Sequence, residues 1–194
     1  RPLILKRYPN GIEESFFYQH NFEELPSFAI GYQDGSEQYI VCNNLATLLY
    51  MVNLGAIAQN PWHSRIDHSD RPDYIVFDLD PGDVSYDMVC EVAQAIKTVL
   101  DDLKLHAYPK TSGASGMHVL LPLRREYSYE QAADFALLIA NVVQQKNPEI
   151  VTLERALKTR PKKMVYLDTL QNAEGKTASS VWSVRERPGA PVSV

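Results

Sequence analysis

The sequence predicts an α/β (α+β) fold in which a mainly antiparallel central sheet is flanked by helices. Two apolar runs that end in carboxylates, 74–80 and 164–168, have the composition of buried strands. Two longer segments, 83–103 and 128–146, repeat apolar residues with the period of amphipathic helices. Turn residues such as Pro-Asn-Gly at 9–11 indicate hairpins between short strands. With 194 residues, 45% of them hydrophobic, the chain can bury a sizeable core and is expected to form one domain.

The first quarter of the chain is predicted to form short strands and then one helix. The strand candidates are residues 1–7, 15–18, 28–31 and 38–42. Asn43 or Asn44 is expected to cap the helix, and Gly55 to end it. Its apolar positions follow helical spacing and are Leu45, Leu48, Leu49 and Val52.

Two further helices follow. Asp83 is expected to cap the second helix, whose apolar stripe packs on the sheet. The stripe consists of Val89, Val92, Ala93, Ile96, Val99, Leu100 and Leu103. Ser128 and Gln131 form a capping box for the third helix, which ends at Asn147. The predicted buried side of this helix is Ala132, Phe135, Ala136, Ile139 and Val143.

Composition limits the location of the protein. The chain has no run of about 18 apolar residues and no signal-peptide pattern, so we expect a cytoplasmic protein with no membrane partner. Cys42 and Cys90 lie in no CxxC pair, which indicates free thiols and no zinc site. His63 and His68, in or beside a polar loop at 65–73, are expected to be surface histidines.

Charge is distributed unevenly along the chain. The net charge is −5, but residues 154–187 hold eight basic and four acidic side chains. This segment therefore carries +4 and the remainder −9. A locally basic segment can bind phosphates within an acidic protein, and a solvated basic face is the alternative.

The run Tyr74-Ile-Val-Phe-Asp78-Leu-Asp80 is the strongest chemical signal in the sequence. In an extended strand the i, i+2 spacing points Asp78 and Asp80 to the same face. Adjacent carboxylates repel each other unless a cation lies between them, so the pair suits a divalent-cation site. A strand end with two solvated carboxylates fits the pattern equally well.

Two later segments offer donors to an anion. In Lys110-Thr-Ser112-Gly-Ala-Ser-Gly-Met-His118, two glycines allow backbone N–H groups to approach a phosphate, and Lys110 and Ser112 add side-chain donors. A plain hairpin loop and a structural histidine at His118 are the alternatives. Arg185 and Arg187 would lie on one side of an extended tail, as bidentate phosphate contacts require.

Together these motifs resemble the polymerase domain of bacterial DNA ligase D and its stand-alone relatives, in the archaeo-eukaryotic primase superfamily. The resemblance covers nearly the whole chain. It is carried by Ile-Val-Phe-Asp78-Leu-Asp80-Pro-Gly, Lys110-Thr-Ser112-Gly-Ala-Ser-Gly-Met-His118-Val, Val-Tyr-Leu-Asp168-Thr-Leu-Gln171-Asn172 and Ser-Val-Arg185-Glu-Arg187-Pro-Gly-Ala-Pro. It implies an RRM-like primase-polymerase core and a metal-dependent nucleotidyltransferase that extends DNA primers with ribonucleotides or deoxyribonucleotides in end joining and gap-filling repair.

The resemblance also implies roles for residues. Asp78, Asp80 and Asp168 would hold two divalent ions, Mn²⁺ or Mg²⁺, for a two-metal mechanism. The implied nucleotide-binding residues are Ser112, His118, Arg185, Arg187, Gln171, Lys176, Phe16 and Phe17, with Lys110 as an additional donor. The phenylalanines would stack on a base or sugar.

Partners and departures follow from the same resemblance. The implied partners are primer-template DNA or broken DNA ends, NTPs and dNTPs, ligase and nuclease modules and Ku, in a nucleoid-associated setting. Asn60, an implied nucleotide-binding residue, stands where many relatives have a nucleotide-site histidine before Pro-Trp, and Ser115 stands where they often have lysine. Relatives also have further N-terminal and C-terminal segments, so we expect residues 1–194 to be a trimmed form of the domain.

Two other functions fit parts of the pattern. Haloacid-dehalogenase phosphatases also begin with a hydrophobic-Phe-Asp-Leu-Asp run, but their later Asp pair is matched here only by Asp101-Asp102, inside the following helix. A non-catalytic nucleic-acid-binding module of the same fold is the second alternative. A comparison of the native chain with Asp168→Ala distinguishes this alternative, because a pure binding module would lose no activity in the variant.

Overall fold

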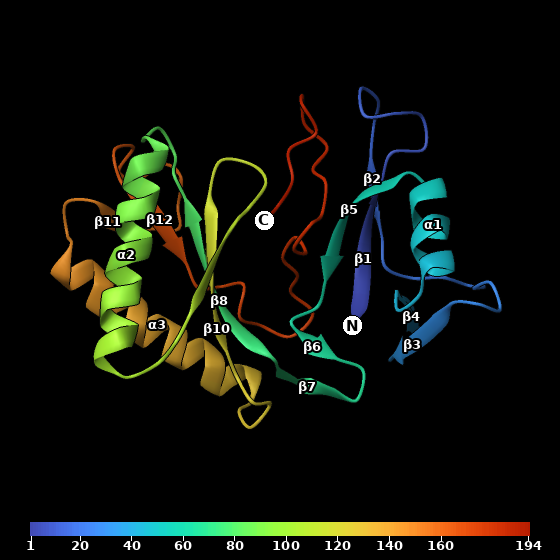
Figure 1. Cartoon of the computed structure of the whole chain (residues 1–194), viewed down its shortest axis with the longest axis horizontal. Helices are drawn as coiled ribbons and strands as arrows, with labels where there is room; N and C mark the ends of the chain where they lie inside the picture. Colours follow the sequence, from blue (N-terminus) through green and yellow to red (C-terminus); the bar gives the residue numbers. More distant parts are fainter.

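The computed structural model describes residues 1–194 as two five-stranded sheets, a two-stranded ribbon and three helices (Figure 1). The first sheet has the order β2-β1-β4-β3, with β5 paired to β1. Its strands are β1 (Pro2–Arg7), β2 (Phe17–Gln19), β3 (Ile30–Asp34), β4 (Glu37–Val41) and β5 (Ala56–Pro61). All its pairings are antiparallel.

The second sheet carries the sequence motifs. Its order is β11-β12-β8-β10-β9, and only the β11–β12 pair is parallel. Its strands are β8 (Tyr74–Asp80), β9 (Tyr108–Thr111), β10 (Met117–Pro122), β11 (Val151–Thr152) and β12 (Val165–Asp168). The predicted mainly antiparallel α/β architecture is therefore confirmed.

Helices α2 (Tyr86–Asp102) and α3 (Tyr129–Lys146) cover one face of the second sheet (Figure 1). Alternate residues of β8, namely Ile75, Phe77 and Leu79, belong to the 18-residue core formed with these helices. The residues between them point to the opposite face. This alternation places Asp78 and Asp80 on the uncovered face, toward the first sheet.

The helix ends test the predicted caps. Asn44 caps α1 (Leu45–Asn53), and Ser128 and Gln131 form the expected capping box of α3. The prediction of Asp83 as the cap of α2 is wrong. Ser85 caps this helix by accepting a hydrogen bond from Met88 N–H, because residues 81–84 form a turn after β8.

Two other expectations need correction. Residues 64–72 are not a polar loop but an antiparallel ribbon of β6 (Ser64–Arg65) and β7 (His68–Pro72). His63 is not a surface residue; it is fully buried, with its ring 5.2 Å from the Tyr74 ring. Its position at the junction of β5 with this ribbon, which ion pairs of Asp73 hold in place, accounts for the burial.

Helix α1 forms where predicted, but its apolar face is turned outward. The buried residues of the helix are Thr47 and Met51, and Met51 belongs to the smaller core of the first sheet. The four apolar positions used to predict the helix are all exposed: Leu45, Leu48, Leu49 and Val52. Helical spacing therefore identified the element without identifying its buried side. Leu103, at the end of α2, is also exposed.

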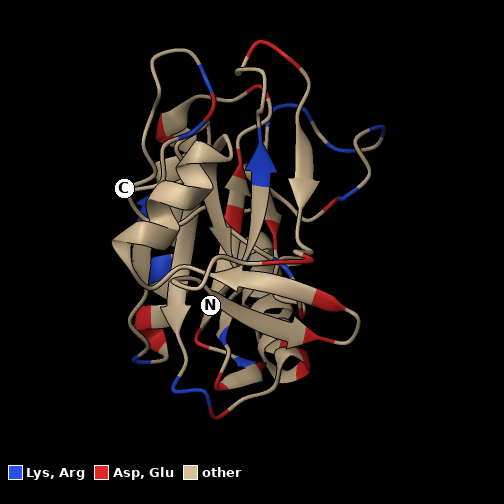
Figure 2. Cartoon of the chain, turned by 90° about the vertical axis from the view of Figure 1, so that its right-hand side faces the viewer, with Lys and Arg blue, Asp and Glu red and all other residues tan.

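The C-terminal segment runs between the two sheets (Figure 1). It bonds to the first sheet through Ser180 N–H, which donates to Gln59 O, and to the second through Thr111 N–H, which donates to Val194 O. Acidic and basic residues are interspersed over the whole chain (Figure 2). No helix is long and apolar enough to cross a membrane.

Candidate active site

Titratable side chains form one row across four strands of the second sheet. Strand register sets Asp78 opposite Asp168 on β12 and opposite His118 on β10. His118 in turn lies opposite Lys110 on β9. Residues directly opposed in antiparallel strands point to the same face, so these side chains share the face that α2 and α3 leave uncovered. Asp80, two residues beyond Asp78, joins them there.

The carboxylates in this row repel one another. Burial, followed by the charges of Asp80 and Asp168, raises the pKa of Asp78 to about 7. Burial and Asp168 also raise the pKa of Asp80. Neither Asp80 nor Asp168 forms an ion pair, and Asp78 has only the His118 ring, with Nε2 3.4 Å from Oδ1. The site therefore has an excess of negative charge that its own side chains do not neutralise.

The other end of the row is basic and buried. Lys110 Nζ lies 3.3 Å from His118 Nδ1, and both side chains are almost completely enclosed. Burial, with a contribution from Arg185, lowers the pKa of Lys110 to about 8. Burial, then Lys110 and Arg185, lowers the pKa of His118 to about 3. His118 is therefore a neutral ring between a cation and a carboxyl group.

The turn between β9 and β10 is organised by Ser112. Its Oγ accepts hydrogen bonds from the N–H groups of Ala114 and Gly116, each at 3.1 Å. A Cβ at Gly116 would lie 2.1 Å from Leu79 O, so only glycine allows the turn to approach β8 this closely. Ser112 is thus buried as a structural acceptor, and its hydroxyl proton is still available to a ligand.

The structure separates the two predicted arginines. Arg185 Nη1 donates to Ser112 O at 2.7 Å, which brings the C-terminal segment onto the turn. Arg187 is exposed, and the chain turns there, with Ala190 N–H donating to Arg187 O. The segment is not extended at this point, so the i, i+2 spacing does not align the two guanidinium groups.

The remaining predicted residues lie around this core. Asn60 and Arg185 line a cavity of about 150 Å³ together with Lys6 and Glu186, which form a 2.5 Å ion pair. Phe16 is 47% exposed and covers Lys6, whose Nζ is 4.1 Å from the ring centroid.

Three predicted residues have few side-chain contacts. Phe17 is 45% exposed and lies against Arg7. Gln171 is half-buried and Lys176 exposed in the segment after β12, and the side chains of both lack hydrogen bonds within the chain.

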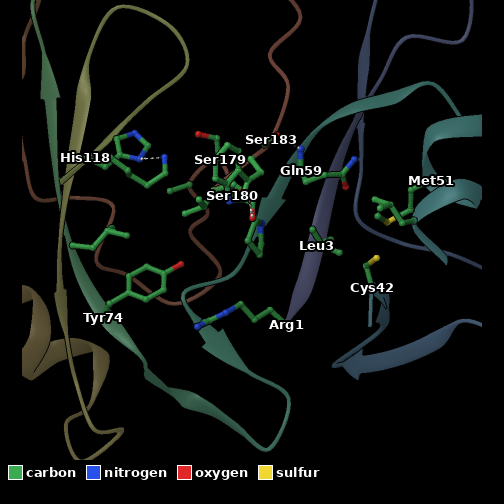
Figure 3. Close-up of a pocket in the computed structure, with 17 residues that line it drawn as sticks. Arg1, Leu3, Cys42, Met51, Gln59, Tyr74, His118, Ser179, Ser180 and Ser183 are labelled. Carbon is green, nitrogen blue, oxygen red and sulfur yellow. Dashed lines mark hydrogen bonds between the residues drawn. The ribbon is translucent and has the colours of Figure 1, made fainter. Parts of the chain in front are cut away.

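A larger cavity of about 530 Å³ lies between the sheets (Figure 3). His118 points into it from the second sheet, while Gln59 and Leu3 line it from the first. Serines of the C-terminal segment line it as well: Ser179, Ser180 and Ser183. None of the three aspartates lines this cavity, so it reaches the basic end of the row and stops short of the carboxylates.

Comparison with known proteins decides the family. The family model described as "LigD, primase-polymerase domain" matches residues 1–194, which is the whole chain. The chain belongs to this family. It is therefore a primase-polymerase domain of the nucleotidyltransferase class, and the phosphatase alternative is wrong, because the match includes every motif that suggested it.

Relatives and a solved structure agree with this assignment. The bifunctional non-homologous end joining protein LigD of Bacillus subtilis is 38% identical over 95% of the chain, and the multifunctional LigD of Pseudomonas aeruginosa is 33% identical over 100%. The chain spans 30% and 24% of these two proteins. The polymerase domain of Mycobacterium tuberculosis ligase D, solved in complex with DNA, matches with a TM-score of 0.89 and 27% identity. This match covers 100% of the chain and 73% of the solved one.

Membership of the family implies dependence on a metal, and the donor set fits one. Asp78, Asp80 and Asp168 offer carboxylate oxygens, the ligands of hard divalent cations, in a place where nearby cations only partly offset their repulsion. No three His, Cys, Asp or Glu side chains converge closely enough in this structure to enclose an ion. The three aspartates thus share a face, with Asp78 and Asp168 directly opposed, while their carboxylates are not close enough together to enclose an ion.

Sequence reasoning assigned no individual role to two residues that contact the strands carrying the aspartates. Asn172 is buried and bonds to both backbone groups of Val76 at 2.8 Å, tying the segment after Asp168 to β8. Arg160 covers the Tyr166 ring at 3.7 Å and is the cation that opposes the raised pKa of Asp80. The sequence signal for Arg160 was its place in the basic segment 154–187. The only signal for Asn172 was its place in the motif that follows Asp168.

Proposed function

We propose that residues 1–194 act as one catalytic domain that extends a DNA primer with nucleotides, as a step in non-homologous end joining or gap-filling repair. The observation that carries the proposal is the placement of Asp168 opposite Asp78, with Asp80 on the same face. Two divalent ions, Mn²⁺ or Mg²⁺, would supply Lewis-acid activation of the primer 3′ hydroxyl and charge stabilisation of the leaving pyrophosphate. Asp78, Asp80 and Asp168 would hold them.

Other residues of the chain would bind and orient the nucleotide. His118 Nε2 faces Asp78, and Ser112 with the backbone of its turn lies at the end of the same strand pair. Arg185 adds positive charge next to this turn, as the recognition of a triphosphate requires. Phe16 and Phe17 offer exposed aromatic faces for stacking on a base or sugar.

Partners of the whole repair protein are part of this proposal. The mycobacterial relative was solved in complex with DNA, and the Bacillus and Pseudomonas relatives are end-joining proteins. We infer primer-template DNA or broken ends as substrate and NTPs or dNTPs as co-substrates. The same inference gives ligase and nuclease modules and Ku as partners on the nucleoid, in the cytoplasm.

The substrate class is tested with a labelled primer on a short gapped duplex that carries a 5′ phosphate, in Mn²⁺. NTPs and dNTPs are supplied separately, and a duplex without the 5′ phosphate is run beside it. Extension by either nucleotide class supports the proposal. If the native chain binds nucleotide by calorimetry and extends neither duplex, primer extension by these 194 residues is excluded.

The alternative of a non-catalytic binding module is tested with Asp168→Ala. Asp101→Ala, an exposed carboxylate of α2, is the matched control. A catalytic domain loses extension in Asp168→Ala and keeps it in Asp101→Ala, while DNA affinity changes little in both. Equal behaviour of the two variants in every assay would favour the binding module.

A further inference from the structure

The contact between Lys110 and His118 gives Lys110 a role that differs from direct phosphate binding. Lys110 Nζ donates to Thr111 O at 3.0 Å and lies 3.3 Å from His118 Nδ1 (dashed line in Figure 3). Only 6% of each residue is exposed. Lys110 also lines the cavity between the sheets, and its ammonium group contacts the edge of the imidazole ring that lies away from Asp78.

The chemistry of the two groups determines where the ring proton lies. A lysine ammonium group has three donors and no acceptor, so His118 Nδ1 must accept with its lone pair. A neutral imidazole has one N–H, and it must then be on Nε2. Nε2 is the atom that faces Asp78 Oδ1, at 3.4 Å.

The surroundings of His118 do not favour another arrangement. A doubly protonated ring would place an N–H against the Lys110 ammonium in a buried position, with the Arg185 guanidinium also nearby. A ring protonated on Nδ1 alone would set two donors against each other and leave a lone pair facing the Asp78 carboxylate. Both arrangements lose the buried hydrogen bond from Lys110 Nζ to His118 Nδ1 and set an N–H against the ammonium group.

We propose that Lys110 is a positioning residue that holds His118 in its Nε2–H tautomer, with the N–H on the ring edge that faces Asp78 and the bound nucleotide. This inference rests on the proposed function and adds the means by which one histidine becomes a fixed donor. It resembles the carbonyl and carboxylate groups that orient histidine ligands at metal sites, with a cation in their place. Lys110 then affects the nucleotide through His118 and not by touching it.

The tautomer can be measured in the native chain, without any activity. The five histidines are labelled with ¹⁵N, and the resonances of His118 are assigned by their loss in His118→Gln. The inference requires an unprotonated, hydrogen-bonded Nδ1 and a protonated Nε2. A proton on Nδ1 would overturn it.

A double-mutant cycle tests how Lys110 acts. Lys110→Met should lower kcat/KM for primer extension by about 10- to 100-fold, the usual effect of losing an orienting partner, and Lys110→Arg should restore most of it. In a His118→Gln background, Lys110→Met should cost less than about threefold, because the residue it acts through is gone. If the double variant instead loses kcat/KM by the product of the two single losses, Lys110 contacts the substrate itself and the inference is wrong.

The controls keep the two proposals separate. Lys146→Met, at an exposed position on α3, should leave both the NMR signature and kcat/KM unchanged. If Lys110→Met does not fold, the kcat/KM of Lys110→Arg and the NMR spectrum of the native chain still test the positioning role of Lys110. If the native chain shows the Nε2–H tautomer but no primer extension, the proposed function fails while the positioning contact stands.

Discussion

Asp168 on β12 lies directly opposite Asp78 on β8, in a register that also pairs Leu167 with Leu79. Residues far apart in the sequence thereby become neighbours on one face of a sheet whose other face is packed against helices. Two opposed carboxylates without a cation between them destabilise a sheet. This cost is expected at a site that works with bound cations, and it leads to measurable consequences.

The first consequence concerns pH. The pKa of Asp78 is raised from 3.8 to about 7, so the folded chain binds this proton more tightly than the unfolded chain. Its contribution to stability is complete below about pH 4 and is lost as pH rises through 7. In EDTA, Asp78→Asn should therefore raise the free energy of unfolding by about 4 kcal/mol at pH 8 and by less than about 1 kcal/mol at pH 4.

This comparison isolates Asp78 from other groups. The pKa values of His118 and His63 are lowered by burial, to about 3 and about 4, so these residues oppose Asp78 in the acidic range. Because both histidines are present in native and variant chains, urea titrations of the two at each pH cancel their effect. An equal difference at pH 4 and pH 8 would show that Asp78 ionises normally.

A second prediction concerns the approach of the Ser112 turn to β8. In Gly116→Ala the new Cβ would meet Leu79 O at 2.1 Å, so the turn or the strand must move. We expect a loss of about 3 kcal/mol in unfolding free energy together with reduced extension. Gly35→Ala, where nothing lies within 4 Å but φ is +56°, should cost about 1 kcal/mol and leave extension unchanged. Full activity in Gly116→Ala would argue against a role for the turn.

Asn172 provides a third test. Its amide bonds to the N–H and the C=O of Val76, and Asn172→Ala would leave both backbone groups buried without partners. We expect a loss of about 3 kcal/mol, measured by chemical denaturation. Asn141→Ala, an exposed residue bonded to Leu137 O, should change stability by less than about 0.5 kcal/mol. Similar values for the two variants would contradict this account.

We expect substitutions of Phe16 and Phe17 to differ in their effect on protein stability and to be alike in their effect on primer-template binding. Phe16 packs near Tyr8 and Tyr18 and over Lys6, whereas Phe17 lies only against Arg7. Phe16→Ala should cost about 1 kcal/mol of stability, and Phe17→Ala almost none. Each should weaken primer-template binding by about 1 to 3 kcal/mol in fluorescence titrations. Unchanged affinity in both variants would remove stacking from the account.

Local patterns predicted much of this fold because local physics determines it. The apolar run before Asp78 identified β8, the i, i+2 spacing identified the shared face of Asp78 and Asp80, and the capping box placed the start of α3. Predictions of burial were wrong where burial depends on packing against a segment that is distant in the sequence. The apolar face of α1 is exposed, and His63 is buried by a ribbon whose polar sequence suggested a loop.

The row across the second sheet was beyond sequence reasoning for the same reason. Nothing within residues 110–118 shows that Lys110 Nζ will be buried against His118, since strand register depends on the whole sheet. The separation of Arg187 from Arg185 likewise depends on a turn that the tail adopts against the Ser112 loop. Motifs named these residues, and only the assembled sheet shows which of them meet.

The most direct test of the central claim compares the native chain with Asp78→Ala in primer extension on the gapped duplex, with Mn²⁺ and with the more active nucleotide class. Asp101→Ala is the control, and circular dichroism verifies that each variant is folded. We predict that extension falls by at least about 1,000-fold in Asp78→Ala and is unchanged in Asp101→Ala. Undiminished extension by folded Asp78→Ala would show that the carboxylate row is not the centre of the reaction.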